Sequence, residues 1–174
     1  MGEPQGKELE ALRERRAALR GKYLRAPAER PPTQAAGVHH VAFICADVEE
    51  TIGFYQDFLG FPLVELVENR DYPGSSHFFF DIGHGNLLGF FDFPGHDHPA
   101  QHETIGGLQH LALSVTEEQF RGAKARFDAA GFEYLGPDRG ADDSLYIRDP
   151  NGVSVELYQE RLGYFNGVAL LTED

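Results

Sequence analysis

The stretch Gly37-Val-His-His-Val-Ala-Phe43 returns later in the chain, in related form, as Gly107-Leu-Gln-His-Leu-Ala-Leu113. Each copy is followed by a helical pattern and then by a Gly-Phe pair. His40 and His110 therefore occupy equivalent positions, each at the start of a short apolar strand. A duplicated unit can bring such residues face to face across a pseudo-twofold axis, where two imidazoles can share one metal ion.

Both copies predict a β-α-β-β-β module. In the first module, a strand and a helix that begins at a capping box and ends near Leu59 precede three strands, over about 62–69, 76–82 and 86–93. In the second, a strand and a helix ending near Ala130 precede three strands, over about 132–136, 143–148 and 152–158. A four-stranded sheet with one helix leaves a face uncovered, so we expect the two modules to lie side by side.

The 174 residues fit one domain built from two halves. We expect an N-terminal amphipathic helix with its linker over 1–30. A single domain over 37–160 then contains the two modules, at about 37–93 and 107–160, and a C-terminal tail covers 161–174. The first thirty residues carry eight Lys/Arg and five Asp/Glu, whereas the remainder carries seven and twenty-three. This basic element is either a solvated appendage or a helix that packs on the core or on a second subunit.

The net charge of −13 argues against nucleic acid or an anionic membrane surface as a partner. The sequence shows no signal peptide and no apolar run near the roughly 18 residues that a membrane span needs. Cys45 is the single cysteine, which excludes an internal disulfide and favours a reducing compartment. These features predict a cytoplasmic protein that acts on a small molecule.

Glu156 lies in the otherwise apolar final strand, where burial of an unpaired carboxylate is costly. Metal ligation by His40, His110 and Glu156 would remove that cost and form a facial triad with open positions for water, substrate or oxygen. The alternative is that each histidine is a satisfied rim or core residue and that the glutamate faces solvent. The duplicated histidine together with a mid-strand glutamate favours the metal site.

The repeat also indicates which residues near the predicted metal site are ligands and which are not. Gln109-His110 aligns with His39-His40, so His39 is expected to point to the opposite face. Alignment of the turns at Gly85 and Gly152 places Gly89 opposite Glu156. The symmetric partner of the carboxylate is therefore missing, which predicts a site with three protein ligands.

Other residues have competing interpretations. The linker between the modules contains His96, His98 and His102. This linker is either a solvated loop, or it forms a lid over the site or an adventitious metal site. The phenylalanines of the third and fourth strands pack in the core or line a pocket for an aromatic or apolar substrate. Tyr146, ten residues before Glu156, could offer a hydroxyl near the metal or be a half-exposed strand tyrosine. Cys45 should face away from the site as a structural thiol.

The motif His40–Asp47, Phe54-Tyr55, Leu59-Gly60-Phe61, His110-Leu-Ala-Leu and Asp149-Pro-Asn-Gly-Val-Ser-Val-Glu156-Leu resembles the vicinal oxygen chelate superfamily. That group contains glyoxalases, extradiol ring-cleaving dioxygenases, fosfomycin-resistance enzymes and bleomycin-binding proteins. The resemblance implies an α+β fold of paired βαβββ modules that form a cup around a divalent metal. It places the metal ligands on His40, His110 and Glu156, and homodimers are common in this superfamily.

Within the superfamily, glyoxalase-type lyases are expected to use four protein ligands for the metal. Gly89 occupies the place of the fourth ligand here, which argues against glyoxalase activity. The extradiol signature is similar to Leu145–Glu156 and includes Tyr146 at the spacing of its active-site tyrosine. The signature's upstream catalytic histidine is absent. Either Asp138, or a histidine from elsewhere such as His77, is then the acid/base residue, or the reaction is a different one.

Three functions follow from these patterns. The first is an extradiol-like dioxygenase in which Fe(II) chelates two vicinal oxygens of the substrate. The second is a lyase, isomerase or thiol transferase that uses Mn, Ni, Co or Zn at the same residues. The third is a non-catalytic protein that sequesters an aromatic ligand, which a complete triad argues against.

Overall fold

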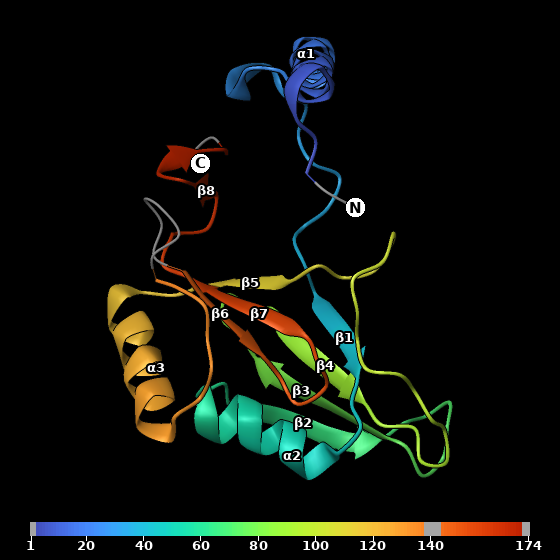
Figure 1. The fold of residues 1–174 in the computed structure, drawn as a ribbon. Coiled ribbons are helices and arrows are strands. Elements are labelled where there is room, and N and C mark those ends of the chain that lie inside the picture. Colours follow the sequence, from blue (N-terminus) through green and yellow to red (C-terminus); the bar gives the residue numbers. More distant parts are fainter. Residues whose placement is uncertain (1–2, 138–143, 172–174) are drawn as a thin grey trace.

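The computed structural model describes residues 3–137 and 144–171. The first module contains β1 (His40–Ile44), α2 (Val48–Ile52), the π-helical segment η2 (Gly53–Phe58), β2 (Leu63–Glu68), β3 (Ser76–Asp81) and β4 (Leu87–Phe91). The second contains β5 (Leu111–Ser114), α3 (Glu117–Ala130), β6 (Ser144–Arg148) and β7 (Ser154–Tyr158). Figure 1 shows the helices of both modules at the outer side of the two sheets.

Each module forms its own sheet, with strand order β1-β4-β3-β2 in the first and β5-β7-β6 in the second. The first strand of each module pairs in parallel with the last, and the remaining pairs are antiparallel. The strand expected over 132–136 is wrong, because this segment makes a single bridge between Leu135 and Tyr146. Pro137, which has no backbone N–H, follows directly and cannot donate to a ladder.

The helix starts follow the sequence pattern, but one helix changes its pitch. Thr116 and Gln119 form the expected reciprocal capping box at the start of α3. The α-helix expected to reach Leu59 instead widens into η2, where the Leu59 N–H bonds to the carbonyl of Phe54 at 2.9 Å. The wider turn lets the adjacent side chains of Phe54 and Tyr55 both be buried.

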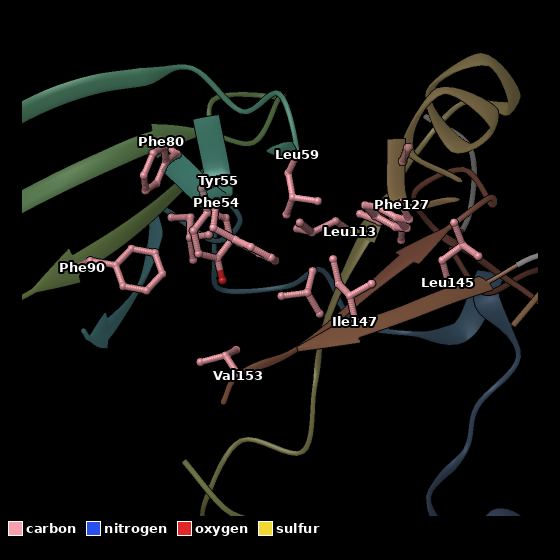
Figure 2. Close-up of a cluster of buried hydrophobic side chains, with 14 of the residues drawn as sticks. Phe54, Tyr55, Leu59, Phe80, Phe90, Leu113, Phe127, Leu145, Ile147 and Val153 are labelled. Atoms are coloured by element: carbon pink, nitrogen blue, oxygen red, sulfur yellow. The ribbon is translucent and has the colours of Figure 1, made fainter. Parts of the chain in front are cut away.

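A core shared by both modules holds the sheets and helices together. Figure 2 shows Tyr55 and Leu59 of the first module pointing toward Leu113 and Ile147 of the second. The largest fully buried side chains are aromatic: Tyr55, Phe78, Phe80, Phe90 and Phe127. Three of the expected strand phenylalanines, at positions 78, 80 and 90, are thus core residues.

A buried polar junction links the turn before β7 to the first module. The Tyr55 hydroxyl donates to Asp149 Oδ2 at 3.0 Å, across 94 positions of sequence. Asn151 of the same turn accepts from the Ala46 N–H at 2.9 Å and donates to the Thr51 hydroxyl at 3.2 Å. The start of the strand that carries Glu156 is therefore fixed by the first module.

The N-terminal helix α1 (Gly6–Tyr23) is present as expected and has no buried residue. Figure 1 shows it apart from the sheets, at the same end of the molecule as the short strand β8 (Tyr164–Phe165), which pairs with β9 (Val168–Ala169). A short 3-10 helix η1 (Pro27–Glu29) lies in the linker, and the Arg30 guanidinium contacts the Leu170 carbonyl. None of the helices in the described residues is long and apolar enough to span a membrane.

Candidate metal centre

The strand registers confirm how the two modules correspond. Ala112 of β5 pairs with Glu156, and Ala42 of β1 pairs with Gly89. His110 and His40 each lie two residues before the paired alanine. Gly89 therefore occupies the position equivalent to Glu156, as the alignment of the two turns predicted.

His110 and Glu156 form the centre of the candidate site. The His110 Nε2 atom lies 3.1 Å from Glu156 Oε2. The glutamate is only 6% exposed, although it lies on a strand between apolar residues. A carboxylate so deeply buried needs partners, and one of them is the imidazole predicted to share a metal with it.

The second oxygen of Glu156 is held by two hydroxyl groups on the neighbouring strand β6. Ser144 Oγ donates to Oε1 at 2.7 Å, and the Tyr146 hydroxyl donates to the same oxygen at 2.5 Å. The Tyr146 ring also meets the His110 ring edge to face, with centroids 5.9 Å apart. The tyrosine therefore lies beside the pair, and its hydroxyl donates to the glutamate.

The Nδ1 atom of His110 is also engaged. It contacts Oε1 of Gln109, the preceding residue. The amide nitrogen of Gln109 donates to Glu103 Oε1 of the linker at 2.9 Å. Both ring nitrogens of His110 therefore face oxygen atoms, Nδ1 toward the amide and Nε2 toward Glu156.

His40 lies outside this cluster. Its Nδ1 is 2.9 Å from Nδ1 of His39, so the expectation that His39 points away is wrong. Regular alternation begins only where β1 begins, at His40, and does not extend to the residue before it. Among residues 3–137 and 144–171, no three His, Cys, Asp or Glu side chains are grouped closely enough to hold a metal.

The first module has an apolar version of the same site. Phe79 pairs with Gly89, as Tyr146 pairs with Glu156. A Cβ atom at Gly89 would lie 3.1 Å from the Phe79 ring, which therefore fills the space of the missing side chain. The Phe79 ring also meets the His40 ring edge to face, with centroids 5.9 Å apart.

His77, the other histidine considered as an acid/base residue, lies against this apolar region. Its ring stacks on Phe91 with centroids 3.7 Å apart and contacts Phe79 at 4.2 Å. Within the described residues its Nε2 atom is buried and has no hydrogen-bond partner. Burial, followed by the nearby charge of His40, lowers the pKa of His77.

The remaining candidates lie elsewhere. Asp138 falls outside the described residues. The linker histidines line a cavity of about 900 Å³ beside β1, whose lining includes neither His110 nor Glu156: His96, His98 and His102. His96 Nε2 lies 3.0 Å from the Tyr72 hydroxyl. Cys45 is buried, and burial raises the pKa of its thiol to about 11, which fits a structural residue.

Sequence reasoning missed Gln109 and Ser144 as parts of the site. Ser144 carried a usable signal, because it precedes Tyr146 by two positions and so shares its face of β6. Gln109 aligns with His39 in the repeat, and this alignment predicts no contact with His110. Its contact with Nδ1 arises where the chain has not yet entered the strand, so side-chain alternation does not predict it.

A sequence profile of the Glyoxalase/Bleomycin resistance protein/Dioxygenase superfamily matches residues 37–157, more than half of the chain. The chain belongs to this superfamily. MhqA of Bacillus subtilis, named for ring-cleaving dioxygenase activity, is 36% identical over 132 residues, which cover 73% of the chain. The chain spans 41% of the length of MhqA.

Solved structures of superfamily members share the fold. The domain from Frankia sp. EAN1pec superimposes with a TM-score of 0.63 at 21% identity, over 74% of this chain and 100% of that one. The fosfomycin resistance protein FosX of Listeria monocytogenes, complexed with Mn(II) and sulfate, has a TM-score of 0.56 at 19% identity, over 74% and 96% of the two chains. At these identities the likeness concerns the fold.

Proposed function

We propose that the chain binds one divalent metal ion through His40, His110 and Glu156 and uses it to chelate two vicinal oxygens of a small substrate. The contact of 3.1 Å between His110 Nε2 and Glu156 Oε2 carries this proposal. An imidazole nitrogen and a carboxylate oxygen are typical donors for a transition-metal ion, and here they face each other, with the glutamate buried and the histidine partly exposed.

The donor set fits a metal on chemical grounds. A metal between His110 and Glu156 would neutralise a carboxylate that is otherwise costly to bury. His40 would supply the third donor from the equivalent position of the first module. Its side chain is exposed and contacts the rings of His39 and Phe79, so metal binding would require the His40 ring to turn away from them. Gly89 adds no fourth ligand, which leaves positions for two substrate oxygens and one further molecule.

A bound metal would act as a Lewis acid and as a template that lowers the pKa of a substrate hydroxyl. The side chains of this protein would divide the remaining work. Tyr146 and Ser144 hold the glutamate, and the Phe79 ring opposite Gly89 offers an apolar wall. An apolar ring with two adjacent oxygens at one edge matches this combination of surfaces.

We infer that ring-cleaving dioxygenation with Fe(II) is the reaction that these features support best. The three-ligand set, the position of Tyr146 beside it and the similarity to MhqA all favour it. The alternative is a lyase, isomerase or thiol transferase reaction with Mn, Ni, Co or Zn at the same residues. Oxygen dependence separates the two, because only the dioxygenase consumes O₂.

The test is oxygen uptake by the Fe(II)-loaded protein with a panel of substituted catechols, whose two hydroxyl groups are adjacent. We expect substrate-dependent O₂ consumption that is lost in Glu156→Gln, which keeps the size of the side chain and removes its charge. No uptake with any substrate would contradict the dioxygenase. Turnover that continues without oxygen would select the lyase or transferase alternative.

A further inference from the structure

Both members of the His110–Glu156 pair are held from behind by side chains that do not face the other member. Ser144 holds the glutamate and Gln109 holds the histidine. We propose that Gln109 and Ser144 are positioning residues that fix this pair in the geometry of a metal-binding half-site. The inference rests on the proposed metal function of the pair.

Ser144 determines which carboxylate oxygen is available. Its Oγ atom and the Tyr146 hydroxyl both donate to Glu156 Oε1, so that oxygen is fully engaged. Oε2 is the oxygen that faces His110. Ser144 is itself 4% exposed, and a side chain at Gly136 would collide with its carbonyl oxygen, so the strand is closely confined there. The glutamate is therefore set to bind through one oxygen.

Gln109 determines which ring nitrogen of His110 is available. Its amide nitrogen donates to the Glu103 carboxylate, which can only accept, and this fixes the direction of the amide. The amide oxygen is then left to accept a hydrogen bond from Nδ1 of His110. With Nδ1 carrying that hydrogen, the Nε2 lone pair can serve as the metal donor.

The first module repeats only the contact to the histidine, because the Nδ1 atom of His39 lies 2.9 Å from Nδ1 of His40, and it has no carboxylate half. His39 stands in the place of Gln109, His77 in the place of Ser144 and Gly89 in the place of Glu156. Ser144 donates to Glu156, whereas the buried Nε2 atom of His77, at the equivalent position, has no hydrogen-bond partner among the described residues. Preorganisation of the site is thus confined to the second module, and His40 joins a pair that is already in place.

The test measures Mn²⁺ affinity by isothermal titration calorimetry on the metal-stripped chain of 174 residues. Loss of such supporting contacts typically weakens metal binding by about 10–100-fold, and we expect this for Ser144→Ala and for Gln109→Ala. Ser144→Thr, which retains a hydroxyl, should recover part of the loss. Ser114→Ala is the matched control, because it removes a serine hydroxyl of β5 that bonds to the Glu160 carbonyl, away from the pair.

The outcomes are separable. Wild-type binding with unchanged affinity in both alanine variants would overturn the positioning role and leave the metal site standing. Absence of Mn²⁺ and Fe²⁺ binding by the wild-type protein would overturn the metal site and this inference together. Thermal unfolding of each variant checks that it is folded. If Ser144→Ala does not fold, Gln109→Ala decides, because Gln109 is exposed and its truncation opens no cavity.

Discussion

Replacement of Tyr55 by phenylalanine should weaken the junction between the two modules. The Tyr55 hydroxyl donates to Asp149 Oδ2 at 3.0 Å, and both residues are buried, at 0% and 5% exposure. Asp149 Oδ1 still accepts from the N–H groups of Asn151 and Val153, so the carboxylate keeps part of its shell. A hydrogen bond to a charged group contributes roughly 1.5–3 kcal/mol, so we expect a loss of about 2 kcal/mol in the free energy of unfolding.

Urea unfolding at neutral pH measures this loss, and a decrease of about 4–8 °C in Tm should accompany it in a chain of this size. Tyr134→Phe is the control, because its hydroxyl also donates to an aspartate, Asp128 at 2.6 Å, but on an exposed face of α3. The control should change little. Equal losses in the two variants would mean that burial does not determine what this hydrogen bond contributes to stability.

Three further predictions concern the same structure. Burial raises the pKa of Asp149, so the folded chain holds this proton more tightly than the unfolded chain does. Its contribution to stability is then present in acid and is lost as pH rises through the folded-state pKa. Asp149→Asn should remove this component of the urea-unfolding profile, and identical wild-type and variant profiles would contradict it. Gly89→Ala should cost about 1–2 kcal/mol, because its Cβ would meet the Phe79 ring at 3.1 Å, and Phe79→Leu should reduce that cost in the double variant. His40→Ala should weaken Mn²⁺ binding in calorimetry, whereas His110→Ala should abolish it, because of the two histidines it is His110 that contacts the glutamate. A larger loss of Mn²⁺ affinity in His40→Ala than in His110→Ala would argue against a preformed half-site.

The duplicated segment made the register of the strands predictable. The turns at Gly85 and Gly152 precede the last strand of each module, and strand pairing has a fixed period of two, so Gly89 had to match Glu156. The segment over 132–136 had a strand-like pattern, but Gly136 at its end and Pro137 directly after it limit the pairing. The local sequence pattern therefore predicted the strand pairing correctly elsewhere, but it predicted a full strand over 132–136 where only a single bridge forms.

The site was predictable only in part. The sequence indicates His110 and Glu156 because a duplicated histidine and a buried carboxylate are both unusual. Ser144 could have been placed on the same face of β6 as Tyr146 from its spacing, but the contact of Gln109 with His110 could not be predicted, because it forms before the strand begins. The ring contact between His39 and His40 was missed for a related reason, since alternation does not hold before β1 begins.

The most direct test of the account is the stoichiometry of metal binding by the stripped chain. Calorimetric titration with Mn²⁺, and with Fe²⁺ under anaerobic conditions, should show one site per chain in the wild-type protein. Glu156→Gln should lose that site while it unfolds at a similar temperature. Failure of the wild-type protein to bind either ion, or equal binding by the Glu156 variant, would contradict a metal centre at this pair.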